Sequence, residues 1–174
     1  MHATERRVDP FEDGIDVALR VGSITHESMV ARQVLSYRHV LVASPKLIGR
    51  HGLPRTPDDL QRFPCAVWGL DTSATCQWEL GESVVTPDAV MVTNDYAHLR
   101  RNALAGQVLT ELPPFLAADS IRAGHLVPLL VGHPMPEQHI NLLYSSHRYL
   151  SAIVRAYLDF CEAQAVHIME ACQP

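Results

Sequence analysis

The segment from Asp9 to Gly22 (DPFEDGIDVALRVG) constrains the fold more than any other part of the sequence. It reads as the end of a short acidic helix, a glycine stop, and then a strand closed by a second glycine. Its apolar residues alternate, with Ala18 between them, so we expect a strand that is covered on both faces. Such a strand belongs inside a parallel α/β sheet with a neighbour on each side, yet it begins almost at residue 1.

Composition favours a packed domain and argues against several classes of protein. The 174 residues are 47% hydrophobic, which suits one medium domain or two small lobes. The net charge is -5 and Lys46 is the only lysine, which argues against disorder and against a nucleic-acid-binding surface. Because no apolar run reaches about 18 residues and the polar start is no signal peptide, we expect a cytoplasmic protein without a membrane partner.

The residues that carry chemistry do not form a recognisable catalytic or metal-binding motif. The four cysteines lack CxxC spacing, so we expect reduced thiols, with Cys65 packed in an apolar strand rather than reactive. The ten histidines are scattered and show no HExxH, so neither a metal nor a cofactor is expected. There is no GxSxG motif and no glycine-rich phosphate loop, so we expect no catalytic residues and no enzyme.

Strands alternate with helices along the rest of the chain, which predicts an α/β fold with a largely parallel sheet. The expected strands are 39–43, 65–69, 77–80, 89–92, 108–112, 126–131 and 140–144. The expected helices are 46–51, one starting at Thr56, 96–105, 115–122, and a last one capped by Ser151. In the last helix an apolar set recurs every three or four residues, which predicts one buried face. The set is Leu150, Ile153, Val154, Tyr157, Leu158, Cys161 and Ala165.

A series of short motifs carries a resemblance to a known family. They are Asp16–Gly22 (DVALRVG), Met29–Arg32 (MVAR), Val40–Pro45 (VLVASP), His51–Leu60, Asn94–Ala97, Ala103–Gly106, Leu112–Leu116 (LPPFL), Gly124–Val127 (GHLV) and Leu150–Phe160. Their order and spacing over residues 8–162 resemble the effector-binding domain of LysR-type transcriptional regulators. One small departure is Gln107, which stands where the family usually has a Gly-Ile pair.

This resemblance implies a periplasmic-binding-protein-like fold, in which crossover strands join two α/β lobes and an effector lies in the cleft between them. The first lobe would comprise residues 1–36 plus 141–174, and the second residues 37–140. The family's helix-turn-helix and linker helix are not recognised here. Nor is the strand-helix-strand unit, roughly sixty residues or more with its flanks, that opens the effector domain. We therefore expect an N-terminally truncated domain with an incomplete first lobe.

Four residues are candidates for effector contact under this resemblance. Ser23 follows the carboxyl end of the first strand, although such serines often only cap a local turn. Thr93 and Asn94 lie where a strand meets a helix N-terminus, which favours a carboxylate, although Asn94 or Asp95 can equally be the N-cap. Arg38 precedes a presumed crossover and can pair with an anion or stay solvated. Together they predict a small anionic effector.

The leading functional hypothesis is an effector-binding domain that senses a small molecule and controls transcription in the intact family. We expect a homo-oligomer that reaches DNA only through a helix-turn-helix domain absent from these residues. One alternative is an interaction or dimerisation fragment that binds no ligand and completes its sheet by domain swapping. Another is a stand-alone solute-binding module, which the lack of an export signal disfavours.

Overall fold

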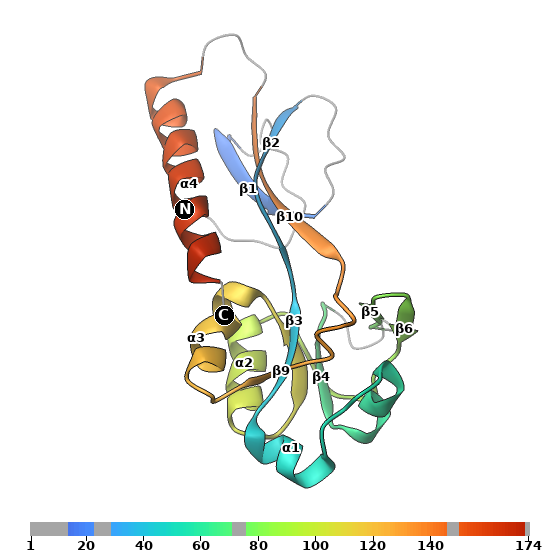
Figure 1. The fold of residues 1–174 in the computed structure, drawn as a ribbon. Helices are drawn as coiled ribbons and strands as arrows, with labels where there is room; N and C mark the ends of the chain where they lie inside the picture. The colour runs from blue at the N-terminus through green and yellow to red at the C-terminus, as the bar shows by residue number, and fades with distance from the viewer. Residues whose placement is uncertain (1–13, 23–28, 71–75, 146–149, 173–174) are drawn as a thin grey trace. The chain divides into compact units, whose positions relative to one another are not determined.

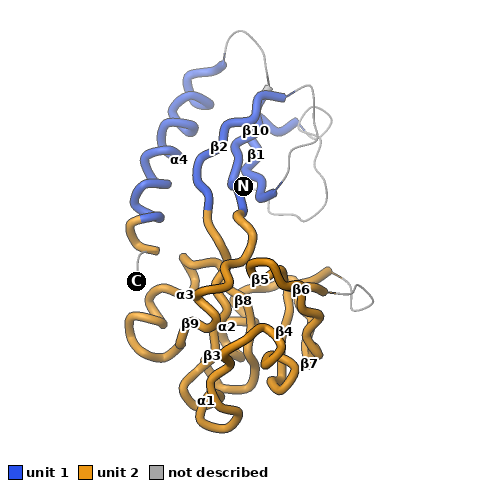
Figure 2. Tube along the Cα trace, turned by 45° about the vertical axis from the view of Figure 1, so that its right-hand side comes forward, with its two compact units in different colours: residues 1–36, 138–169 blue, residues 37–137, 170–174 orange. Residues whose placement is uncertain are grey.

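The computed structural model describes residues 14–22, 29–70, 76–145 and 150–172 (Figure 1). The chain divides into two compact units (Figure 2): unit 1 is residues 1–36 with 138–169, and unit 2 is residues 37–137 with 170–174. The boundaries at 36/37 and 137/138 fall inside the strands β2 (Met29–Arg38) and β10 (Glu137–Ser145). The α/β class expected from the sequence is confirmed. No described helix is long and apolar enough to cross a membrane.

Unit 1 is a small sheet with one helix packed on it. The strand order is β1–β10–β2, and β1 (Val17–Val21) runs antiparallel to β10, with Val17 opposite Tyr144. The helix α4 (Ala152–Ala171) contributes buried residues to a cluster with this sheet. The buried members are Leu142, Val154 and Leu158, and the partly buried ones include Val17, Val34, Tyr144, Leu150 and Cys161. The sheet and α4 therefore share one apolar core.

The expectation that the first strand is covered on both faces with parallel neighbours was wrong. Among the described residues, β1 lies at the edge of its sheet and its one partner, β10, is antiparallel. Leu19 and Val21 are 55% and 50% exposed. An alternation of apolar residues shows that a segment suits a strand, but the direction and number of its neighbours are set by the connections.

The last helix was predicted correctly in its start and only partly in its buried face. The Ser151 hydroxyl accepts a hydrogen bond from the Val154 amide at 3.2 Å, as an N-cap does. Ile153 and Tyr157, however, are 82% and 45% exposed, although both belong to the predicted apolar set. The buried stripe is narrower than the apolar stripe because α4 meets a sheet of only three strands.

Unit 2 is built on a five-stranded mixed sheet. Its order is β7 (Ala89–Thr93), β4 (Cys65–Trp68), β8 (Leu109–Leu112), β3 (Val40–Ala43) and β9 (Val127–Leu129). The strands β7, β4 and β8 are parallel, whereas β3 is antiparallel to both β8 and β9. The largely parallel sheet that the sequence predicts is therefore limited to three strands. A separate hairpin pairs β5 (Trp78–Leu80) with β6 (Ser83–Val85).

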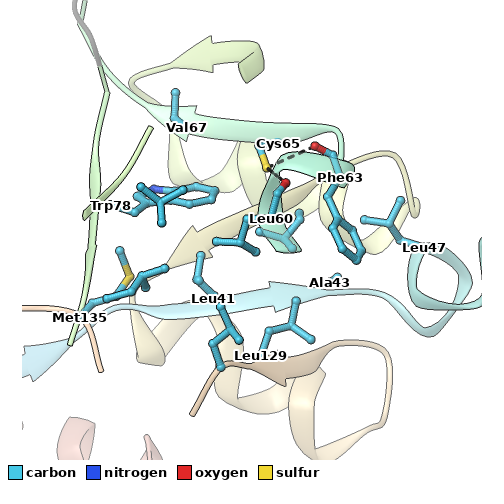
Figure 3. Close-up of a cluster of buried hydrophobic side chains, with 14 residues drawn as sticks. Leu41, Ala43, Leu47, Leu60, Phe63, Cys65, Val67, Trp78, Leu129 and Met135 are labelled. Carbon is cyan, nitrogen blue, oxygen red and sulfur yellow. Dashed lines mark hydrogen bonds between the residues drawn. The ribbon is translucent and has the colours of Figure 1, made fainter. Parts of the chain in front are cut away.

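Each face of this sheet carries its own buried core. Alternate residues of β3 point to opposite faces, so Leu41 joins one cluster and Val42 the other. The first cluster packs Leu41 with Leu60, Cys65 and Trp78 (Figure 3). The second cluster is covered by α2 (Tyr96–Leu104) and α3 (Pro114–Arg122). It contains Val42, Ala66, Leu99, Ala103, Val108, Leu112, Ala117 and Leu126.

Local capping fixes the short helices of unit 2. The Ser44 hydroxyl accepts a hydrogen bond from the Leu47 amide at the start of α1 (Pro45–His51), and Gly52, at φ 82°, ends that helix. Thr56 forms a capping box with Asp59 at the start of the 3-10 helix η1 (Pro57–Arg62). The helix predicted over 46–51 and the one predicted to start at Thr56 are thus confirmed, the second with 3-10 rather than α geometry.

Candidate functional site

Polar and aromatic side chains gather where the parallel strands of unit 2 end. The strands β7, β4 and β8 run the same way, so their carboxyl ends share one edge of the sheet, and the start of antiparallel β3 lies at that edge too. We call the following group the carboxyl edge: Tyr37, His39, Trp68, Thr93, Asn94, Tyr96 and Glu111. Ligands of open α/β sheets bind outside the carboxyl ends of the strands, so this edge is where a ligand is expected.

Aromatic rings form a continuous series along this edge. The indole of Trp68 stacks on the ring of Tyr96, with centroids 6.0 Å apart and planes 17° apart. The Tyr96 ring lies 5.3 Å from the imidazole of His39, which in turn lies 5.4 Å from the ring of Tyr37. Tyr37 then meets Phe115 edge-on at 5.4 Å. These contacts hold the rings in fixed orientations, which suits a binding surface.

Glu111 places a carboxylate among these rings. It lies opposite Leu41 in the pairing of β8 with β3, and its side chain is only 13% exposed. Burial raises its pKa to about 7, and the indole N–H of Trp78 opposes this shift. That N–H lowers the pKa without reaching hydrogen-bond geometry with any partner among the described residues. The carboxylate is therefore close to half ionised at neutral pH.

His39 lies beside this carboxylate but does not act as its counter-ion. Its Nδ1 lies 3.8 Å from Oε2 of Glu111, which is too long for a hydrogen bond. Burial lowers the imidazole pKa to about 4, so His39 is neutral at pH 7, and its buried Nε2 meets no partner among the described residues. Burial and, second, the charge of Glu111 raise the pKa of both Tyr37 and Tyr96, so their hydroxyls stay protonated.

The structure brings two of the predicted residues, Thr93 and Asn94, to the carboxyl edge. The Thr93 hydroxyl accepts a hydrogen bond from the Asp95 amide at 3.3 Å, and the Asn94 carbonyl accepts one from Trp68 Nε1 at 3.1 Å. The N-cap of α2 is Asp95, whose carboxylate accepts from the Ala97 amide at 2.8 Å. Of the two capping residues left open by the sequence, Asp95 is the one used. Effector contact by Thr93 and Asn94 stays a prediction.

The other two predicted residues are placed differently. Arg38 donates from Nη1 to the carbonyl of Met135 at 2.7 Å and lines a pocket of about 220 Å³ beside β3 and β9, together with His133 and Leu130. Leu130 adopts a left-handed conformation at φ 49°, which is uncommon for a leucine. Ser23 lies outside the described residues.

The residues at the centre of the edge, namely Glu111, His39 and Tyr96, were not predicted from the sequence. Glu111 did carry a signal, since it is a charged residue inside the apolar run 108–112, where a strand was predicted. The sequence gives no signal that Glu111 lies near His39, because the pairing of β3 with β8 joins distant parts of the chain. Tyr96 was recognised only as the start of a helix.

The cysteines and histidines give no sign of other chemistry in the described part of the chain. No three His, Cys, Asp or Glu residues there are placed to hold a metal ion. The four cysteines are free, and Cys65 is fully buried with its thiol near the carbonyls of Phe63 and Leu60 (Figure 3). Burial raises the pKa of that thiol to about 12, which fits the packed role expected for Cys65.

Comparison with known sequences identifies similar proteins. The sequence model of the LysR substrate binding domain matches residues 1–166. An HTH-type transcriptional regulator of Xanthomonas campestris pv. campestris (strain 8004) is 31% identical over 92% of this chain and 48% of its own length. CrgA of Neisseria meningitidis serogroup C (strain 8013) is 26% identical over 91% of this chain and 54% of its own length. The chain thus spans about half the length of the curated relatives it matches.

Solved structures show the same fold. The regulatory domain of CrgA, a LysR-type transcriptional regulator from Neisseria meningitidis, superposes with a TM-score of 0.81 at 24% identity and covers 93% of this chain and 81% of that one. The regulatory domain of AphB from Vibrio vulnificus, treated with cumene hydroperoxide, gives a TM-score of 0.76 at 26% identity with the same coverage. The periplasmic-binding-protein-like class expected from the sequence is confirmed.

Proposed function

The chain belongs to the LysR substrate binding domain family, and from that premise we propose that it is the effector-binding regulatory domain of a transcriptional regulator. The curated relatives are named as HTH-type transcriptional regulators, and the chain corresponds to about half of each. In this proposal it acts in the cytoplasm as part of a homo-oligomer, reaches DNA through a helix-turn-helix domain, and catalyses no reaction.

The observation that carries the proposal is the buried carboxylate of Glu111 at the carboxyl edge. A buried charged group without a partner is costly, so a ligand that supplies the partner regains that free energy. Ionisable groups with strongly shifted pKa values gather at functional sites, and here the group lies where open α/β sheets bind ligands. A small molecule at this edge would also contact the rings of Tyr96 and Trp68.

Regulation follows if the effector prefers one of two conformations. A ligand shifts a conformational equilibrium only by its difference in affinity for the two states. We propose that residues 1–36 plus 141–174 and residues 37–140 act as the two lobes of this change. In the same proposal Ser23, Arg38, Thr93 and Asn94 add effector contacts to those of the carboxyl edge.

The test is a thermal-shift screen of this chain against a panel of small metabolites at neutral pH. A true effector should raise the melting temperature progressively as its concentration increases, because it binds the folded state alone. Glu111→Gln should weaken the response to the same compound, whereas Glu79→Gln, an exposed strand residue of unit 2, should leave it intact. A complete panel in which no compound raises the melting temperature would contradict effector binding.

A second candidate function is association with another protein copy. Exposed apolar side chains in unit 1 favour it: Leu19 and Val21 on β1, and Ile153 and Phe160 on α4. Among the described residues β1 also has a free edge, which can accept a further strand. Light scattering tests this idea, since a monomer that persists at high concentration would speak against it.

A further inference from the structure

We infer that the carboxyl edge of unit 2 binds ligands that carry a protonated amine, which Glu111 receives and the neighbouring aromatic rings enclose. This inference rests on the proposed function, because it names the chemical class of the effector. It predicts a cationic effector, whereas the sequence alone predicts an anionic one.

The first step is that Glu111 has no cationic partner among the residues that the structure describes. The titratable groups around its carboxylate are His39 ahead of β3, Tyr37 at the end of β2 and Tyr96 at the start of α2. All three are neutral at pH 7, since burial lowers the pKa of His39 and raises those of the tyrosines. An ammonium group is therefore the charge that this environment lacks.

The second step is an independent observation at Trp78. Its side chain is only 2% exposed, and its Nε1 has no hydrogen-bond partner in the described part of the chain. The same N–H acts on Glu111 and lowers its pKa. The indole therefore favours the ionised carboxylate from the buried side, while the 13% of the Glu111 side chain that stays exposed leaves it reachable from the surface.

The third step concerns the rings around the carboxylate. The partly buried rings of Trp68 and Tyr96 present aromatic surface along the edge, and the buried ring of Tyr37 packs against His39 behind them. The face of such a ring attracts a cation by roughly 0.5–2 kcal/mol, with the larger value in desolvated sites. A protonated amine at this edge would thus be stabilised both by the ionised carboxylate and by the aromatic rings.

The features that suggested an anion are already engaged. The Ala97 amide at the start of α2 bonds to the carboxylate of Asp95, so that helix start is already capped by a negative charge. The Arg38 guanidinium keeps its charge, but it donates to the Met135 carbonyl and lines the pocket beside β3 and β9. An anionic ligand at this edge would meet Asp95 and Glu111, two carboxylates.

The experiment compares two probes that share a skeleton and differ in charge, phenethylamine and 3-phenylpropionate. Titration calorimetry at about pH 8, where Glu111 is ionised, should detect binding of the amine and none of the carboxylate. Glu111→Gln should weaken amine binding about tenfold or more, and Glu79→Gln should not change it. A thermal melt of each variant verifies that it folds.

A second readout does not depend on any variant. The Glu111 carboxyl titrates in the native protein, and saturating phenethylamine should lower its pKa when followed by ¹³C NMR, because the bound ammonium favours the charged form. Equal binding of 3-phenylpropionate, an unshifted Glu111, or full amine binding by Glu111→Gln would overturn the inference. If carboxylates bind and amines do not, the effector-binding function stands and only the class is wrong. If no small molecule in the wider panel binds, the function itself fails.

Discussion

The imidazole Nδ1 of His39 lies 3.8 Å from the Glu111 carboxylate, and burial moves the pKa values of the two groups in opposite directions. The pKa of His39 falls from 6.5 to about 4, so this group adds stability as pH rises from about 4 to 6.5. The pKa of Glu111 rises from 4.5 to about 7, so this group removes stability as pH rises from about 4.5 to 7. The two pH ranges overlap, so within the overlap the two groups change the free energy of unfolding in opposite directions.

In a Glu111→Gln variant, the pH dependence of the free energy of unfolding should be that of His39 alone. The amide keeps the shape but cannot ionise, so the variant should be more stable than the parent by roughly 1–3 kcal/mol at about pH 8. Near pH 4.5 the two should be similar, because the carboxyl of the parent is then protonated in the folded state. Urea unfolding across this pH range measures the difference. Equal stability at about pH 8 would contradict an unpaired buried carboxylate.

In a His39→Gln variant, the pH dependence of the free energy of unfolding should be that of Glu111 alone. The variant loses ring contacts at every pH, which lowers stability by a constant amount. The slope that remains should be that of Glu111, so the free energy of unfolding should fall between about pH 4.5 and 7. The same urea series measures it, and a stability that instead rises across this window would show that Glu111 is not the titrating group.

Two glycines with similar backbones allow a matched test of packing. Gly106 and Gly124 have φ of 73° and 71°, but a Cβ at Gly106 would lie 3.0 Å from the Ser44 hydroxyl, whereas one at Gly124 would meet nothing within 4 Å. Gly124→Ala should cost about 1 kcal/mol for the left-handed backbone, and Gly106→Ala roughly 2–3 kcal/mol, since it also displaces the cap of α1. Equal losses in thermal or urea unfolding would show that Ser44 can move aside freely.

Cys65 should resist alkylation in the folded protein. It is fully buried and burial raises its pKa to about 12, so almost no thiolate is present or reachable at about pH 8. Cys76 is only partly buried and provides an internal control. Mass-spectrometric mapping after iodoacetamide treatment should find Cys76 modified long before Cys65. Equal labelling rates would indicate that unit 2 opens readily around β4.

Features that depend on neighbours in the sequence were predictable. Ser44 and Pro45 start a helix and Gly52 ends it, because capping and left-handed closure involve only a few adjacent residues. The same is true of Ser151 at the start of α4. The family resemblance also rested on such local motifs, and it led to the correct fold class.

Features that depend on distant partners were not predictable. Leu19 and Ile153 look like core residues in the sequence, and their exposure follows from which surfaces the small sheet of unit 1 leaves uncovered. Glu111 and His39 come together only through the pairing of β8 with β3. Their shifted pKa values arise from that burial, so they could not be read from residue types or spacing.

The chain passes from unit 1 to unit 2 within β2 and returns to unit 1 within β10. This arrangement has a consequence for synthesis. The sheet of unit 2 lies within one continuous stretch, residues 37–137, whereas unit 1 needs segments from both ends of the chain. The whole unit 2 sheet is translated, and leaves the ribosome, before β10 and α4 leave it. Because compact units tend to fold as they emerge, unit 2 should be formed while β1 and β2 still wait for their partner strand. A premature stop soon after residue 137, before β10 is made, would then release a finished unit 2 with unpaired, aggregation-prone strands attached.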